Sequence, residues 1–220
     1  MAGCCNPTDY RRLFSRKSAA RDLRRYRERG LNGTSLELVR LAGDVEGASV
    51  LDVGGGIGAI ELELLDAGAE RATNVELSGG YEDAAGELIA ERGLEGRVER
   101  RVGDFVTTEL EPYDVVVLHR VVCCYPDADA LLGAAADHTK RTLLLTYPQE
   151  RVWMRAGLRL INVWLLLTRC GFRTYVHPVA KIVAAAEARG LRLERREQHG
   201  LLWESAVFAR QRRMPVCPSE

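Results

Sequence analysis

Short apolar segments alternate with helical patterns along most of the chain. Five segments have the length and apolar content of strands: residues 49–53, 72–77, 98–102, 114–118 and 142–147. The run DVVVL at 114–118 is almost continuously apolar, as expected for a strand that is covered on both faces. Between these strands, apolar residues recur three or four positions apart, as on the buried side of a helix. This alternation predicts an open, mostly parallel sheet.

Both ends of the chain depart from this alternation. Residues 16–29 predict a helix that stops at Gly30, and Ser35 is the expected cap of a second, short helix. The alternation breaks after Pro148 and resumes with a helix at Pro178. Two strands, 191–197 and 201–209, then follow with only a short link between them. They predict a hairpin, and a hairpin that closes a parallel sheet means one antiparallel strand.

The pattern divides the chain into three parts. We expect an N-terminal helical arm at 1–35, an α/β domain at 36–209 with an excursion at 151–177, and a tail at 210–220. The linker after the fifth strand of a doubly wound sheet leaves at the strand-end edge where ligands bind. The arm and the excursion are therefore expected to meet as a lid. Ordinary core packing of their apolar residues is the alternative.

A glycine turn follows the first strand. The stretch LDVGGGIG spans residues 51–58 and continues with Ala59. Gly54, Gly56 and Ala59 fit the dinucleotide pattern G-x-G-x-x-G/A. The same turn, taken from Asp52 to Gly58, fits the pattern D-x-G-x-G-x-G of S-adenosylmethionine (SAM) sites. Either ligand would use the close backbone approach and the helix N-terminus that such a turn provides.

Acidic residues at or just after the ends of three strands help to distinguish a dinucleotide site from a SAM site. Asp52 would repel the diphosphate of a dinucleotide, whereas it complements an ammonium or sulfonium group. Glu76 can accept hydrogen bonds from ribose hydroxyls in either case. Asp104 can accept from an adenine amino group while Phe105 flanks the base, or Asp104 caps the next turn instead. A NAD-linked oxidoreductase leaves Asp52, Asp104 and the closing hairpin unexplained, so we favour SAM.

Five features in order carry a resemblance: LDVGGGIG, NVELS at 74–78, VGDF at 102–105, DVVVLHRVV at 114–122 and the closing hairpin. Over roughly 36–209 the chain resembles the class I SAM-dependent methyltransferases. The resemblance implies a Rossmann-like, doubly wound α/β fold with a mostly parallel seven-stranded sheet and one antiparallel strand. It implies SAM as cofactor, and the cofactor-binding residues we expect are Asp52, Gly54, Gly56, Gly58, Glu76, Leu77, Asp104, Phe105 and Leu118.

A narrower similarity rests on two features. Tyr125-Pro126 follows the fourth strand, and an apolar excursion with Arg and Trp follows the fifth. Both look similar to the magnesium-protoporphyrin O-methyltransferases, which makes a porphyrin one candidate acceptor. We therefore expect a small-molecule acceptor, flat or apolar and with carboxylates that Arg155 and Arg159 could pair with.

The charge and hydropathy of the chain limit the kinds of partner that we expect. Lys plus Arg equals Asp plus Glu at 31 each, so no overall field attracts nucleic acid, and we expect no nucleic-acid partner. The basic residues between Arg11 and Arg29 form either a phosphate-binding arm or a solvated helix face.

The start of the chain lacks a secretory signal, and no apolar run approaches the ~20 residues of a membrane span. We expect a cytoplasmic protein, with surface association left open and the oligomeric state unassigned.

The expected chemistry is in-line methyl transfer, most simply to an oxygen. A protein promotes this reaction mainly by aligning the nucleophile, and a base helps only when the acceptor proton has a high pKa. His119, directly after the fourth strand, is the candidate general base, or it only orients a ligand. Candidate substrate-binding residues near the same edge are Tyr125, Tyr147, Trp153 and His177.

Adjacent cysteines raise a thiol or metalloid alternative. Cys4-Cys5 and Cys123-Cys124 would resemble an arsenite methyltransferase site if they met at one mouth. Neighbouring side chains on a helix point apart, however, and no C-x-x-C pair occurs, so we expect no metal site and no catalytic cysteine. A SAM-binding module without catalysis is a further alternative, since it would keep every motif.

Overall fold

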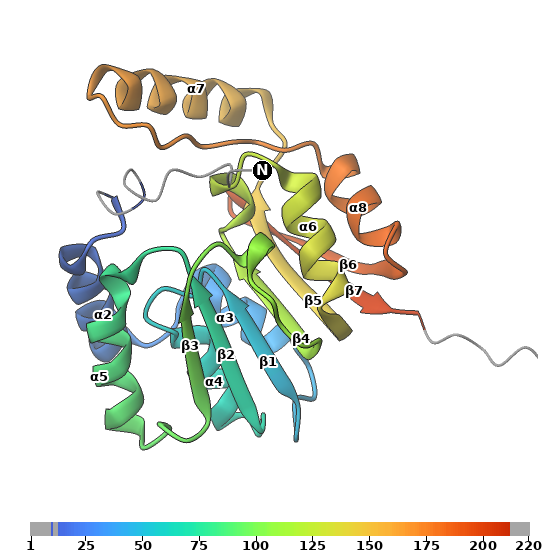
Figure 1. Ribbon diagram of the computed structural model, residues 1–220. Helices are drawn as coiled ribbons and strands as arrows, with labels where there is room; N and C mark the ends of the chain where they lie inside the picture. The colour runs from blue at the N-terminus through green and yellow to red at the C-terminus, as the bar shows by residue number, and fades with distance from the viewer. Residues whose placement is uncertain (1–9, 11–12, 212–220) are drawn as a thin grey trace, which may run out of the picture.

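The computed structural model describes Tyr10 and residues 13–211 of the 220-residue chain. Seven strands form one sheet in the order β3-β2-β1-β4-β5-β7-β6 (Figure 1). Strand β7 is antiparallel to both of its neighbours, and the other pairs are parallel. This confirms the predicted fold class. The strands are β1 Ser49–Val53, β2 Arg71–Glu76, β3 Val98–Val102, β4 Tyr113–His119, β5 Thr139–Pro148, β6 Leu191–His199 and β7 Trp203–Arg210.

Helices cover both faces of the sheet. The α-helices are α2 Arg16–Arg29, α3 Gly33–Leu41, α4 Ala59–Asp66, α5 Glu82–Arg92, α6 Ala128–Asp137, α7 Val152–Leu167 and α8 Val179–Glu187. Helices α2 to α5 share one hydrophobic core, and α6 and α8 share another on the opposite face. Alternate side chains of β4 enter the two cores: Val115 and Val117 on one face, Val116 and Leu118 on the other. This explains the continuous apolar run that predicted a strand covered on both faces.

Three differences from the sequence predictions have a clear physical reason. Helix α3 begins at Gly33, with Asn32 as its cap and Ser35 in its first turn, because Ser35 and Asn32 form a reciprocal capping box. The excursion contains helix α7, which the sequence did not predict because apolar residues occupy most of its circumference and obscure the helical repeat. Strand β7 begins at Trp203 instead of residue 201 because the hairpin turn extends to residue 202.

The arm is part of the fold from α2 onward. Its buried residues Ala19, Leu23 and Tyr26 belong to the core that also contains α5. Arg27 forms ion pairs with two acidic residues on α5, and its Nη2 lies 2.6 Å from Glu87 Oε1. Arg27 of the basic run is therefore paired within the chain. Cys4, Cys5 and Cys217, with residues 212–220 of the predicted tail, lie outside the described residues.

Candidate functional site

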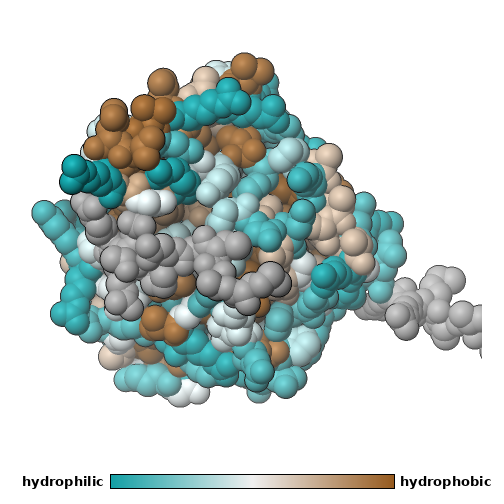
Figure 2. Space-filling view, turned by 45° about the horizontal axis from the view of Figure 1, so that its top comes forward, coloured by the Kyte–Doolittle hydropathy of each residue, from teal (hydrophilic) through white to brown (hydrophobic). Residues whose placement is uncertain are grey.

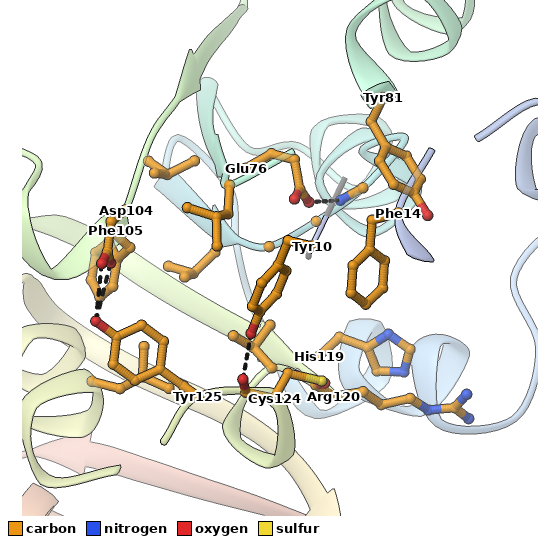
Figure 3. A pocket seen from close by; sticks show the side chains of 18 of the residues that line it. Tyr10, Phe14, Glu76, Tyr81, Asp104, Phe105, His119, Arg120, Cys124 and Tyr125 are labelled. Carbon is orange, nitrogen blue, oxygen red and sulfur yellow. Dashed lines mark hydrogen bonds between the residues drawn. The ribbon is translucent and has the colours of Figure 1, made fainter. Parts of the chain in front are cut away.

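A cavity of about 450 Å³ opens where the carboxyl ends of β1, β2 and β4 meet (Figure 3). In a doubly wound sheet this edge is the expected ligand site, because the loops that follow the parallel strands all leave there. The glycine turn and Glu76 line one part of the cavity, and Asp104 and Phe105 line another. His119, Arg120 and the segment after β4 complete its wall.

The turn after β1 needs glycine for two reasons. Gly54 and Gly56 have φ values of +64° and +60°, in the left-handed region that favours glycine. A Cβ on Gly54 would lie 2.8 Å from a methyl carbon of Val121, and a Cβ on Gly55 would lie 2.4 Å from a carboxylate oxygen of Asp52. The turn is thus held close to the side chains beneath and beside it, which leaves its other side open to the cavity.

Glu76 ties the turn to the end of β2. One of its carboxylate oxygens accepts a hydrogen bond from the Gly56 amide at 3.1 Å, and the other accepts from the Ser78 amide at 3.0 Å. Burial raises the pKa of Glu76, and these two amide donors oppose that rise. The carboxylate also lines the cavity, so it can accept from a ligand hydroxyl while it holds the turn.

A layer of buried charged side chains lies beneath the turn. Asn74 Nδ2 donates to Glu61 at 2.7 Å, and Arg100 donates to the Gly56 carbonyl at 3.0 Å while its Nη1 lies 3.8 Å from Glu61. Asp52 is fully buried, and its carboxylate has no hydrogen-bond partner among the described residues. Burial raises the pKa of Asp52 to about 7, and the Arg100 charge opposes the rise. This layer positions the glycine turn from below.

Asp104 has the capping role, one of the two that the sequence left open for it. Its side chain caps the turn after β3 by accepting from the Val106 amide at 3.1 Å. Both of its oxygens also lie 3.2 Å from the Tyr125 hydroxyl, which donates to them (Figure 3). Phe105 is buried beside them and meets the His138 ring edge to face. Asp104, Phe105 and Tyr125 therefore form one wall of the cavity.

His119 lies at the end of β4, in the cavity wall. Its Nε2 atom is 2.9 Å from the Thr34 hydroxyl, which also accepts from the Arg120 guanidinium at 2.9 Å. Burial, and to a smaller extent the Arg120 charge, lower the pKa of His119 to about 3. The imidazole is therefore neutral near pH 7, and it is a weak proton acceptor.

Arg120 is a cavity residue that the sequence analysis missed. It has a φ of +59°, which is uncommon for a residue with a side chain. Its guanidinium carbon lies 4.4 Å from the centroid of the Trp203 ring, and both residues line the cavity. The sequence offers one signal for this role, which is the position of Arg120 directly after His119 at the end of a strand. Residues that follow a parallel strand of such a sheet lie at the edge where ligands bind.

Aromatic rings from distant segments lie over the cavity. Tyr10 and Phe14 line it, and their rings are 5.5 Å apart. Phe172, from the excursion, lies edge to face with both, at 5.2 Å from Tyr10 and 5.8 Å from Phe14. The Tyr10 hydroxyl donates to the Cys124 carbonyl (Figure 3). The structure therefore brings the arm and the excursion together, at this aromatic cluster.

Cys123 and Cys124 also line the cavity. Their Sγ atoms are 3.6 Å apart, in a short 3₁₀ helix, Val122–Cys124. The expectation that adjacent cysteine side chains point apart is therefore wrong, because it assumed α-helical geometry. A hydrogen bond with Cys124 is the main cause that lowers the pKa of the Cys123 thiol, while burial opposes it.

The predicted site residues fall into two groups. Those that line the cavity are Gly54, Gly56, Glu76, Leu77, Asp104, Phe105, His119 and Tyr125. Those outside its described lining are Asp52, Gly58, Leu118, Tyr147, Trp153 and His177.

Packing explains why the second group lies elsewhere. Tyr147 is buried and donates to Glu204 at 2.9 Å, so its hydroxyl is used inside the fold. The His177 Nε2 atom is 3.0 Å from the Tyr125 carbonyl oxygen. Trp153 is 47% exposed on α7. Leu118 is fully buried in the sheet. Contact with a ligand in the cavity is therefore not supported for these four side chains.

Comparisons with known proteins agree with this geometry. The chain matches the methyltransferase domain family over residues 23–196. No curated protein gives a match. The magnesium protoporphyrin IX methyltransferase of Synechocystis, solved with bound S-adenosylhomocysteine, aligns with a TM-score of 0.73 at 20% identity, covering 94% of this chain and all (100%) of that chain.

Two further solved structures align well. Mitomycin 7-O-methyltransferase is 28% identical with a TM-score of 0.60, covering 81% of this chain and 54% of that chain. An O-methyltransferase family 2 protein from Planctomyces limnophilus, in complex with apigenin, is 16% identical with a TM-score of 0.67, covering 89% of this chain and 62% of that chain. This chain thus spans little more than half the length of these two proteins.

The family match covers most of the chain, and the fold gathers a glycine turn and two acidic strand ends around one cavity. The residues present fit SAM: the turn allows close backbone approach, and the Glu76 and Asp104 carboxylates line the cavity as hydrogen-bond acceptors. The chain therefore belongs to the methyltransferase domain family, and it is a SAM-dependent methyltransferase.

Proposed function

We propose that this enzyme methylates an oxygen atom of a small-molecule acceptor. The observation that carries the proposal is that a single cavity is lined both by the glycine turn with Glu76 and Asp104 and by His119 with Arg120. The first set suits a cofactor, and the second set suits an acceptor. Because both sets border one cavity, a methyl donor and an acceptor held there would be neighbours, as in-line transfer requires.

The proposed cofactor contacts follow from the available polar atoms. Glu76 accepts from the ribose hydroxyls, Asp104 accepts from the adenine amino group, and the backbone at Gly54 and Gly56 borders the amino-acid part. Bound SAM supplies the electrophilic methyl group. Asp52 acts through the turn instead of touching the ligand, because it is buried beneath it.

The proposed acceptor end favours an oxygen that ionises readily. The Arg120 guanidinium lines the cavity and would stabilise a phenolate or carboxylate there. Such an acceptor needs no strong base, which agrees with a pKa of about 3 for His119. We assign to His119 the role of orienting the acceptor through a hydrogen bond. The aromatic rings of Trp203 and Tyr10 suit a flat, largely apolar molecule.

The relatives support a small acceptor. Two of them are named for magnesium protoporphyrin IX and for mitomycin, and the third was solved in complex with apigenin. Arg27 of the basic helix α2 pairs with Glu87 and Glu91 of α5, and we propose no nucleic-acid partner. We also propose that the protein is cytoplasmic, as the sequence predicts.

Ligand titration followed by turnover tests the proposal. Purified protein is titrated with SAM, S-adenosylhomocysteine and NAD, and is then incubated with methyl-labelled SAM and a panel of phenols, carboxylic acids, amines and thiols. We expect binding of the first two ligands and label transfer to an oxygen. Binding of NAD in preference to SAM, or transfer to nitrogen or sulfur alone, contradicts it. SAM binding with no turnover on the panel or on a cell extract supports a binding module without catalysis.

A second candidate is a trivalent metalloid acceptor, favoured by one observation. The Cys123 and Cys124 Sγ atoms, 3.6 Å apart in the cavity, can bind one soft centre together. This candidate is supported over the first if the parent methylates arsenite but no oxygen acceptor, and if Cys123→Ala loses the methylation of arsenite.

A further inference from the structure

Helix α7 exposes large apolar side chains to solvent. Val152, Leu160 and Leu167 are 84%, 73% and 77% exposed, and Trp164 is 61% exposed. Figure 1 shows α7 lying across one end of the molecule, above the ends of the strands. Figure 2 shows hydrophobic side chains gathered toward that end, with hydrophilic ones between them. Exposed apolar groups on this scale mark an interaction surface.

The fold does not need these exposed residues, because it uses the other side of the helix. Met154 and Leu165 are buried, and Leu165 packs with Cys170 and Phe172 of the aromatic cluster. At roughly 100° per residue, six of the eight exposed large apolar residues of α7 fall on one face about 120° wide, on the side of the helix away from Met154 and Leu165, and Ile161 and Leu166 lie to either side of that face. We call this the outer face of α7, and it consists of Val152, Trp153, Leu160, Val163, Trp164 and Leu167.

The hairpin turn between β6 and β7 extends the apolar surface. Leu201 and Leu202 are 76% and 51% exposed. The turn is held beside the start of α7 by Gln149, whose amide donates to the Leu202 carbonyl at 2.9 Å and whose side chain donates to the Gly200 carbonyl at 3.1 Å. Two segments far apart in the sequence thus present apolar side chains near each other.

The charge of this region is of one sign. Residues 151–177 contain Arg151, Arg155, Arg159, Arg169 and Arg173 and no Asp or Glu. Arg155 pairs with Glu150, just before the helix. On α7 itself, Arg155 and Arg159 fall beside the outer face at roughly 100° per residue. Basic residues next to a Trp- and Leu-rich face are typical of helices that lie in a membrane interface.

We propose that the outer face of α7 docks onto the surface of an anionic phospholipid bilayer. Apolar side chains would enter the boundary between headgroups and acyl chains, Trp153 and Trp164 would lie at headgroup depth, and Arg155 and Arg159 would face lipid phosphates. Helix α7 would lie on the bilayer and not cross it, since no described helix is long and apolar enough to span a membrane.

Charge favours a bilayer over a second copy of this chain as the partner of the outer face of α7. Two outer faces packed around a two-fold axis would bring arginines of both copies together, with no acidic residue from 151–177 to pair with them. An anionic bilayer supplies the missing negative charge.

Vesicle co-sedimentation of the full chain tests the proposal. The vesicles are pure phosphatidylcholine, or phosphatidylcholine with about one third phosphatidylserine. We expect the parent to bind the anionic vesicles at least tenfold more tightly, with binding that weakens as salt is raised. The double variant Leu160→Glu, Leu167→Glu should lose at least tenfold of that affinity. Its thermal unfolding and SAM binding should match the parent, because both side chains are exposed.

Two matched controls locate the contact. Arg155→Ala, Arg159→Ala should weaken anionic binding about tenfold, whereas Arg24→Ala, Arg29→Ala on the basic helix α2 should not. Vesicle binding that is unaffected by the Glu substitutions overturns the proposal. So does a parent that ignores anionic vesicles but sediments as a dimer that the same substitutions dissociate, because a second copy would then cover the outer face.

Discussion

The Nε2 atom of His119 lies 2.9 Å from the Thr34 hydroxyl oxygen. Thr34 accepts from the Arg120 guanidinium, which can only donate, so the Thr34 proton is available to Nε2. In the tautomer protonated on Nδ1, the Thr34 hydroxyl donates to Nε2 and Nδ1 remains a donor. Together with a pKa of about 3, this makes His119 better suited to orient an acceptor than to remove its proton.

We therefore predict a modest effect of His119→Ala. Loss of one orienting hydrogen bond should lower turnover about tenfold, since it is worth about 1 kcal/mol, and SAM affinity should be unchanged. Steady-state kinetics and calorimetry measure the two quantities. A loss of 10² to 10⁴ in turnover, with a pH profile that changes shape, would instead support the general-base role predicted from the sequence.

Glu76→Ala should weaken SAM binding at least several-fold. The substitution leaves ribose hydroxyls without their acceptor, which costs about 1–3 kcal/mol. It also removes the acceptor of the Gly56 amide, so the turn loses support. Asp83→Ala, an exposed carboxylate near the start of α5, is the matched control. Calorimetry that shows equal SAM affinity in Glu76→Ala and the parent contradicts the assignment.

The aromatic cluster should control turnover more than cofactor binding. Deletion of residues 1–29 would remove α2 and expose its core partners, because Leu23 and Tyr26 are buried. The double variant Tyr10→Ala, Phe14→Ala is a cleaner test. We expect a folded protein that binds SAM within about threefold of the parent but turns over at least tenfold more slowly. Leu13→Ala, on the exposed side of the arm, is the control; equal turnover in all three proteins contradicts a lid.

Asp52 should make the ligand-free protein lose stability as pH rises. Burial raises its pKa from 3.8 to about 7 in the folded protein, so the folded state keeps a proton that the unfolded chain has released. Its contribution is complete below pH of about 4 and is lost as pH rises through about 7. Asp52→Asn should reduce the fall in unfolding free energy between pH 5 and pH 8 by roughly 1–3 kcal/mol. Urea unfolding measures this, with Asp83→Asn as control; parallel pH curves for Asp52→Asn and the parent would refute it.

The cysteine pair should be dispensable for an oxygen acceptor. Cys123→Ala, Cys124→Ala removes two small cavity side chains that take no part in the proposed transfer. We expect turnover within about threefold of the parent, because the loss is packing alone. In a Cys4→Ser, Cys5→Ser background, phenylarsine oxide should bind the protein, and adding Cys123→Ala, Cys124→Ala should abolish that binding, since the Cys123 and Cys124 Sγ atoms lie 3.6 Å apart. Complete loss of oxygen methylation in this variant would give the thiols a role that the proposal lacks.

Local sequence determined the sheet and the cofactor end of the cavity. The strand at Ser49–Val53, the glycine turn and the carboxylate of Glu76 follow from apolar pattern, turn chemistry and the edge at which parallel strands end. These signals are readable because each depends on a few neighbouring residues. The closing hairpin and its antiparallel strand are local in the same sense.

Only the tertiary structure decided which side chains share the acceptor end. Arg120 and Trp203 meet from β4 and β7, and Tyr10 meets Phe172 across 162 positions of the chain, pairs that no local pattern encodes. Likewise, only the tertiary structure shows that Tyr147 is buried inside the fold and that Asp52 is buried beneath the turn. The physical reason is the same in each case: burial, pKa and side-chain proximity depend on atoms brought together by folding, whereas periodicity and turn preference depend on the adjacent chain alone.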